Sequence, residues 1–97
     1  MNNYVPDNLR LCAKTYEERN KIYGDCYKVQ GRIMKEIFPD GIPMLDPNDF
    51  NRAGIVFKII DKVIRYSANF SEGGHKDSLH DISVYCIMLM ELDEKGI

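Results

Sequence analysis

Residues 46–65, DPNDFNRAGIVFKIIDKVIR, form the stretch whose structure the sequence predicts most firmly. Asp46 followed by Pro47 is typical of a helix start, because the aspartate side chain accepts hydrogen bonds from free backbone amides and proline sets the first helical dihedral angle. Asp49 adds a favourable negative charge to the first turn. Apolar residues then recur at helical spacing and predict one side in a core: Phe50, Ala53, Phe57, Ile60 and Ile64.

Two further helical segments are expected before this stretch. Asp7 is placed to cap a first helix over about residues 9–23, and the chain before it, about residues 1–7, is expected to be weakly ordered. Gly24 interrupts the helical pattern, which resumes from Asp25 to about residue 38. A single long helix kinked at Gly24 is the alternative.

The remaining helix lies near the carboxyl end, between signals that break helices. Residues 39–46 contain two prolines and a glycine and are expected to connect two helices, and residues 70–76 read as a glycine-containing loop. Asp77 or Ser78 then begins a helix that is apolar around most of its circumference, so we expect it to pack both within the protomer and against a second subunit. The sequence predicts an all-α protein, a compact and oligomeric bundle of three to four helices.

Length and charge narrow the classes of protein. Ninety-seven residues suit one domain, residues 1–97, and a net charge of -2 argues against a broad surface for duplex nucleic acid. The three cysteines are too widely separated for a paired zinc or redox motif, so we expect reduced thiols. No apolar run approaches the roughly 20 residues that cross a bilayer, and no leader is apparent at the amino end. We therefore expect a cytoplasmic protein without a membrane partner.

A basic stripe is expected on the helix that follows Asp46. Lys58, Lys62 and Arg65 fall on one side of a helix, together with Asp61. One interpretation is an ordinary solvated surface stabilised by pairs three and four residues apart. The other is a phosphate site, since arginine binds phosphate through a planar fork and lysine as a compact charge.

Asp77 and Asp81 form a second candidate group, because their spacing of four places them on one side of the last helix. Such a pair can hold Mg²⁺ through carboxylate oxygens or orient basic side chains from the preceding helix. Asp77 is also placed to be the helix cap. Asp81 lies one turn inside an apolar helix, so we expect it to meet Lys58, Lys62, Arg65 or a metal ion.

Aromatic side chains gather around the glycine that interrupts the first helical pattern. Tyr23 and Tyr27 flank Gly24 and Asp25, an arrangement suited to stacking a base and binding an amide or sugar hydroxyl. Arg32 follows seven residues after Asp25 and is a candidate additional cation. The plainer interpretation is a helix-breaking glycine with tyrosines at the edge of the core.

Over about residues 14–93, the order of these motifs resembles that of small phage and bacterial domains related to the MazG-like all-alpha nucleotide pyrophosphohydrolases, including those associated with nucleotide modification. The motifs that carry the resemblance are Tyr23-Gly24-Asp25, Tyr27, Arg32-Ile33, Lys62-Val63-Ile64-Arg65, Asp77-Ser78-Leu79-His80-Asp81-Ile82 and Tyr85. The resemblance implies a helical bundle, a dimer or higher oligomer, and a nucleotide pocket near helix and subunit junctions. In the catalytic relatives, acidic residues hold magnesium against a triphosphate and an activated water releases pyrophosphate.

This sequence departs from the catalytic pattern, because the repeated Glu-x-x-Glu motif is missing and Glu17-Glu18 is a poor substitute for it. We therefore expect nucleotide binding, for which no cofactor is required although magnesium is possible, more than efficient hydrolysis. By analogy with other small phage binding proteins, one use is anti-defence: sequestering a cyclic or ADP-ribose-type immune signal in a bacterial host cell. The expected nucleotide-binding residues are Tyr23, Asp25, Tyr27, Arg32, Lys58, Lys62, Arg65 and Tyr85, with Asp77 and Asp81 as tentative metal ligands.

Two alternatives remain open at this point. One is a Mg-dependent nucleoside triphosphate pyrophosphohydrolase whose metal site is assembled from both subunits by Glu17, Glu18, Asp25, Asp77 and Asp81. The other is an oligomeric protein-interaction module without a small ligand, which the apolar last helix favours.

Overall fold

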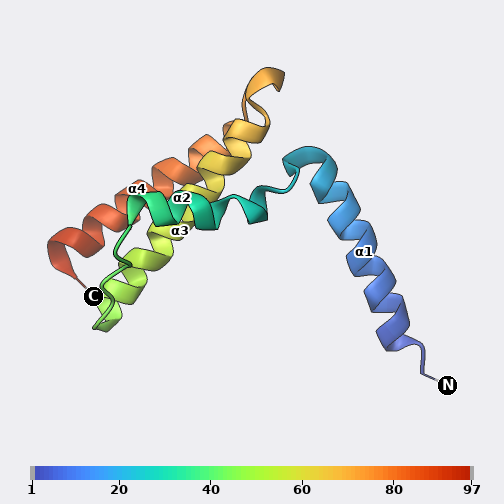
Figure 1. The fold of residues 1–97 in the computed structure, drawn as a ribbon, viewed down its shortest axis with the longest axis horizontal. Coiled ribbons are helices and arrows are strands. Elements are labelled where there is room, and N and C mark those ends of the chain that lie inside the picture. The colour runs from blue at the N-terminus through green and yellow to red at the C-terminus, as the bar shows by residue number, and fades with distance from the viewer. Residues whose placement is uncertain (1, 97) are drawn as a thin grey trace.

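The protein is described here by a computed structural model, which covers residues 2–96 and shows four α-helices and two short 3-10 turns (Figure 1). No β-strand occurs within residues 2–96, so the all-α prediction is confirmed for that range. The elements are α1 (Tyr4–Tyr23), η1 (Cys26–Lys28), α2 (Gln30–Ile37), α3 (Pro47–Ala68), η2 (Phe70–Glu72) and α4 (Lys76–Lys95).

The start of α3 follows the sequence prediction. The Asp46 carboxylate accepts a hydrogen bond of 3.0 Å from the backbone amide of Asp49, and the Asp49 carboxylate accepts from the amides of Leu45 and Asp46 at 3.1 and 3.4 Å. Pro47 occupies the first helical position. These reciprocal bonds form a capping box, which satisfies amides that no helical carbonyl can reach.

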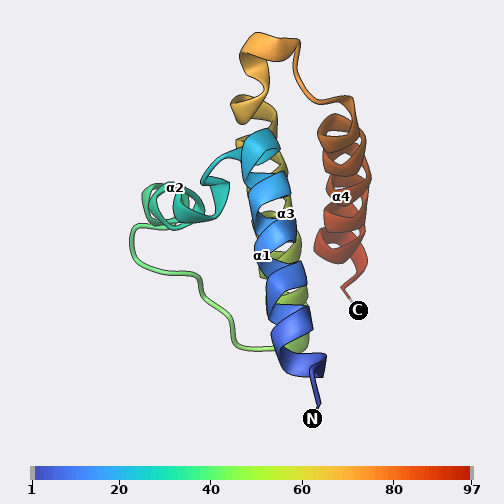
Figure 2. The ribbon, with the colours of Figure 1, turned by 90° about the vertical axis from the view of Figure 1, so that its right-hand side faces the viewer.

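Helices α3 and α4 form an antiparallel hairpin that contains the core (Figure 2). Its apolar buried residues all belong to α3, and Ser78 of α4 is buried as well; the apolar ones are Ala53, Ile55, Ile60 and Ile64. At the open end, Asn48 donates to the Leu92 carbonyl at 3.3 Å and Arg52 pairs with Asp93 at 2.7 Å. The prediction that Phe50 belongs to this core is wrong: its side chain is 56% exposed, because it lies at the edge of a groove between α3 and α4 and not inside the hairpin.

Several predicted boundaries shift in the structure. Helix α1 begins at Tyr4, well before residue 9, because the Asn2 side chain accepts the Tyr4 amide at 2.8 Å and Asn8 donates to the Tyr4 carbonyl. Part of the segment expected to be weakly ordered is therefore helical. At Gly24 the backbone takes a φ of 61°, so α1 ends there and the alternative of one long kinked helix is wrong.

The junction between η2 and α4 also differs from the expected one. His75 is the residue that precedes the first turn of α4, so Asp77 lies inside the helix and is not its cap. The His75 Nδ1 atom lies 2.6 Å from the buried Ser78 hydroxyl, which gives that hydroxyl a polar partner.

Helix α1 projects away from the rest of the chain as a separate arm, the α1 arm (Figure 1). The radius of gyration is 17.0 Å, whereas a compact domain of this length has about 12.5 Å. Only the carboxyl-terminal end of the arm approaches α3 (Figure 1). Helices α2 and α4 lie to either side of α3 (Figure 2). The single chain is therefore less compact than the predicted bundle.

Candidate functional site

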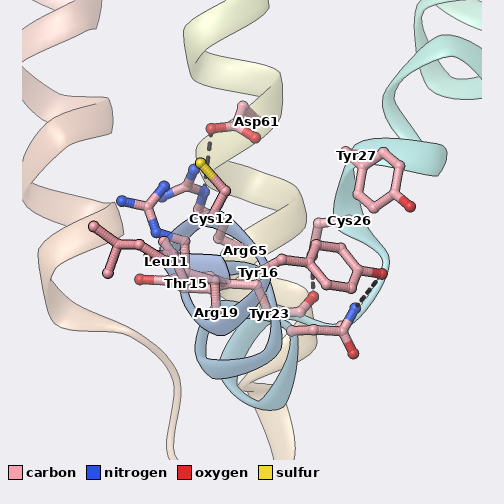
Figure 3. A pocket seen from close by; sticks show the side chains of 12 residues that line it. Leu11, Cys12, Thr15, Tyr16, Arg19, Tyr23, Cys26, Tyr27, Asp61 and Arg65 are labelled. Carbon is pink, nitrogen blue, oxygen red and sulfur yellow. Dashed lines mark hydrogen bonds and ion pairs between the residues drawn. The ribbon is translucent and has the colours of Figure 1, made fainter. Parts of the chain in front are cut away.

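A hollow lies between the α1 arm and α3, and we call it the α1–α3 cleft (Figure 3). Its volume is about 500 Å³. A cleft of this size falls within the range of small-molecule sites. The arm, η1 and α3 supply its walls: Leu11, Cys12, Thr15, Tyr16, Arg19, Asn20, Tyr23, Gly24, Cys26, Tyr27, Asp61 and Arg65.

Arg65 marks the closed end of the cleft, where the arm meets α3. Its guanidinium carbon lies 4.7 Å from the centre of the Tyr23 ring, and its Nε atom lies 3.2 Å from the Asp61 carboxylate. Tyr23 also makes an edge contact with His75, with ring centres 5.8 Å apart. A cation over an aromatic face stabilises by about 0.5–2 kcal/mol, so this stack holds the end of the arm in place.

The arm contributes a second cation, Arg19, to the same cleft. Tyr16 and Tyr27 flank the opening, with their rings edge to face and centres 6.5 Å apart. The hydrogen bond with Tyr27, and then the charge of Tyr27, raise the pKa of Tyr16. Two arginines and the single carboxylate of Asp61 leave the lining of the cleft with one net positive charge.

Asp25 stands at the rim of the cleft. Its carboxylate accepts a hydrogen bond from Asn20 at 2.8 Å and lies 3.3 Å from the Lys28 ammonium group. The bond from Asn20, followed by the bond and charge of Lys28, lowers the pKa of Asp25, and Asp25 raises the pKa of Lys28 in return. Through these two contacts Asp25 links the end of α1 to η1.

The Cys26 thiol lines the floor of the cleft and donates a hydrogen bond to the Tyr23 carbonyl. Burial, and then the negative charge of Asp61, raise the pKa of this thiol. A thiol that stays protonated is a weak nucleophile. The raised pKa therefore disfavours Cys26 as a nucleophile.

The structure brings three of the predicted nucleotide-binding residues together in the cleft: Tyr23, Tyr27 and Arg65. Asp25 stands beside them through its bond to Asn20. Arg32 is an exposed residue of α2 and is not among the described residues that line the cleft.

The other predicted residues lie between α3 and α4. Lys62 pairs with Asp81 at 3.1 Å, and the Lys58 ammonium group lies 5.7 Å from the centre of the Tyr85 ring. Asp81 thus meets Lys62, which is one of the partners expected for it. The basic stripe is divided, because Lys58 and Lys62 contact α4 whereas Arg65 contacts the arm.

Asp77 is exposed in the first turn of α4. Within residues 2–96, no three carboxylate, histidine or cysteine side chains gather in a group that suits a metal ion. Magnesium in this protein stays a prediction from the sequence, with Asp77 and Asp81 as its tentative ligands.

Sequence reasoning missed Arg19, Tyr16 and Asn20, although a signal for Arg19 was present. Of the charged residues of α1, six fall on one half of the helix: Asp7, Arg10, Lys14, Glu17, Glu18 and Lys21. Arg19 alone falls among the apolar and neutral residues of the other half. A single cation among apolar and neutral side chains departs from the charge pattern of the helix, which marks Arg19 as a site candidate.

No protein-family model, curated protein or solved structure matches this chain. Each helix within residues 2–96 is too short or too polar to span a bilayer.

Proposed function

We propose that this protein binds a phosphorylated nucleotide in the α1–α3 cleft. The observation that carries the proposal is the stack of Arg65 on Tyr23 in the same cleft as Arg19. Two guanidinium groups suit the oxygens of a phosphate, because each offers a planar fork of hydrogen-bond donors.

The aromatic walls of the cleft suit a nucleobase. Tyr16 and Tyr27 present ring faces and edges at its opening, and stacking of a base on an aromatic side chain contributes about 1–3 kcal/mol. Asn20 adds an amide at the same wall. The carboxylate of Asp61 holds Arg65 in position, and a phosphate competes with it for the guanidinium group.

Binding without turnover fits these residues better than hydrolysis does. The cleft holds one carboxylate, Asp61, and that carboxylate is paired with Arg65. A metal-assisted attack by water on a triphosphate requires carboxylates that position the ion. A protein of this kind sequesters its ligand, and a nucleotide signal of bacterial immunity, cyclic or of the ADP-ribose type, is the use we propose.

Calorimetry with ATP, ADP-ribose and a cyclic dinucleotide tests the proposal. Arg65→Ala and Arg19→Ala are each expected to weaken binding by about 1.5–3 kcal/mol, because each removes a charged hydrogen bond. Arg10→Ala is the matched control, since Arg10 lies on the same helix as Arg19 but points to solvent and pairs with Asp7. Equal affinity in all three variants contradicts the proposed site.

Product analysis separates binding from the enzymatic alternative. After incubation with ATP and magnesium, the proposal predicts recovery of unchanged ATP, whereas a pyrophosphohydrolase releases monophosphate and pyrophosphate. Mass spectrometry of small molecules released by denaturing protein from a nucleotide-rich lysate then identifies which nucleotide is retained.

A protein-interaction module is the second candidate function, and the exposed apolar side chains favour it. The arm exposes large apolar residues along most of its length, and α4 exposes others, namely Leu79, Val84, Ile87, Met88 and Met90. If none of the nucleotides binds, this function is the one that remains.

A further inference from the structure

The α1 arm has a surface built for contact that the single chain does not use. All 20 of its residues, from Tyr4 to Tyr23, lie within the described part of the chain, and none is buried. Its charges, apart from Arg19, occupy one half of the helix, and Val5, Leu9, Cys12 and Tyr16 form a stripe along the other. Val5 and Leu9 are 63% and 65% exposed.

The side of α3 that looks toward the arm is also uncovered over part of its length. Phe50, Gly54, Asp61 and Arg65 follow one another along this side at spacings of four and seven. Asp61 and Arg65 line the α1–α3 cleft, whereas Phe50 and Gly54 belong to the first half of α3. The arm diverges from α3 toward this half (Figure 1).

A second hollow, of about 360 Å³, lies beside the first half of α3, and we call it the Phe50 groove. Its residues come from the first half of α3 and the last half of α4, with Phe50 exposed at its edge and open space above Gly54. The residues that line it are Phe50, Asn51, Gly54, Ile55, Lys58, Met88 and Leu92. The groove therefore continues the cleft along the same side of α3.

The chain exposes more surface than a folded monomer of its size, as expected for a chain that forms an interface with another molecule. The chain exposes 7600 Å², whereas a folded monomer of its 11.2 kDa mass exposes about 5700 Å². The excess of about 1900 Å² is more than twice the roughly 800 Å² that each partner buries in a stable interface. The radius of gyration of 17.0 Å points the same way.

We propose that a second copy of this chain places its α1 arm between the arm and α3 of the first, over the Phe50 groove. The same contact is made in both directions, so each arm is held by the other copy and the assembly closes as a dimer. The apolar stripe with Val5 and Leu9 packs at the centre of this contact. The charged half of each arm, with both signs present, faces water.

A second copy fits this surface better than an unrelated partner does. The bare stripe of the arm and the bare side of α3 belong to the same chain, so a symmetric exchange covers both at once. The incoming arm also covers the open side of the α1–α3 cleft above Arg65, which encloses the proposed nucleotide site. The inference does not depend on the nucleotide, because the contact rests on the exposed apolar stripe of the arm and on the Phe50 groove, and neither involves a bound ligand.

Sedimentation equilibrium of the purified full chain, without nucleotide, tests the dimer. The wild type is expected at twice the 11.2 kDa chain mass. Leu9→Glu is expected to weaken association by about 100-fold, because it buries a charge in the contact. Lys14→Glu introduces the same residue on the charged half of the arm and is expected to leave the mass unchanged. A monomeric wild type, or a Leu9→Glu protein that dimerises like the wild type, overturns the proposal.

Cross-linking tests the same contact without introducing a charged residue into α1. Cys12 lies near the middle of the arm on the apolar stripe, so a symmetric pairing of arms brings the two copies of Cys12 close together, whereas the exposed Cys86 lies on α4. A short bismaleimide is expected to give covalent dimers that Cys12→Ser abolishes and Cys86→Ser retains. Dimers that depend on Cys86 place the contact on α4 and overturn the proposal.

These tests fail independently of those for the nucleotide. A dimer that binds no nucleotide supports the arm exchange and contradicts the proposed function. A monomeric protein whose affinity for nucleotide falls in Arg65→Ala supports the proposed function and contradicts the arm exchange.

Discussion

The α3–α4 hairpin and the α1 arm are helices of similar length that differ in what holds them. The hairpin contains the buried apolar residues of the described chain, and its two helices are joined by Arg52 to Asp93 and by Lys62 to Asp81. The arm buries none of its residues and is fixed at one end through Tyr23. The comparison shows that the hairpin is stabilised by contacts within the chain, whereas the arm has few contacts with the rest of it.

The largest expected effect is a core deletion in the hairpin. Ile64→Ala removes buried methyl groups from a residue that is 4% exposed, and should destabilise by about 2–5 kcal/mol. Leu9→Ala, in dilute protein where the arms are apart, should change stability by less than about 0.5 kcal/mol. Urea unfolding followed by circular dichroism measures both. Equal costs at high dilution would show that the arm shares the core of the hairpin.

The helix caps give the next largest contrast. The Asp46 side chain bonds the amide of Asp49, whereas Asn3, which precedes α1, makes no capping bond through its side chain. Asp46→Ala should lower the free energy of unfolding by about 1 kcal/mol, and Asn3→Ala should leave it unchanged. The comparison of the two regions fails if both variants unfold at the same urea concentration as the wild type.

Ion pairs should show a smaller difference. The Lys62 side chain is 19% exposed where it meets Asp81, whereas Arg10 and Asp7 on the arm are 75% and 67% exposed. Double-mutant cycles should give a coupling energy of up to about 1 kcal/mol for the hairpin pair and about 0.3 kcal/mol for the arm pair. The opposite order would mean that solvent screens Lys62 more than its exposure indicates.

The smallest effect concerns Asp25, which lies at the joint between the arm and the rest of the chain. Hydrogen bonding by Asn20 and the charge of Lys28 lower the pKa of Asp25 below its reference value of 3.8. A lowered pKa contributes stability that is present above the unfolded value and is lost as the pH falls through the folded value. We expect the Asp25 carboxyl signal in NMR to titrate below 3.8, and Asn20→Ala to move the midpoint upward. A midpoint that Asn20→Ala leaves in place refutes this account of the joint.

The local features of the hairpin were readable from the sequence because they depend on near neighbours. The Asp46-Pro47 start, the core residues Ile60 and Ile64 and the presence of a basic partner for Asp81 follow from spacing and from the chemistry of caps and buried charges. Which of the three basic residues pairs with Asp81 does not. Phe50 was misplaced because the periodic pattern marks which residues share a side. It does not reveal which neighbouring helix covers that side.

The cleft was only partly predictable for a related reason. Tyr23, Tyr27 and Arg65 were singled out, but the division of the basic stripe between Arg65 and Lys62 depends on where α1 and α4 lie around α3. Helical spacing cannot supply that arrangement. Arg19 was detectable as the one charge on the uncharged half of α1, and the direction of the arm was not, because it depends on the backbone at Gly24.

Amide hydrogen exchange along the full chain, measured at high and low protein concentration, tests most directly whether the arm is completed by a second copy. The account predicts that amides of Tyr4–Tyr23 are protected in concentrated protein and exchange faster on dilution, while those of α3 keep their protection throughout. Arm amides that exchange at the same rate at every concentration would contradict it.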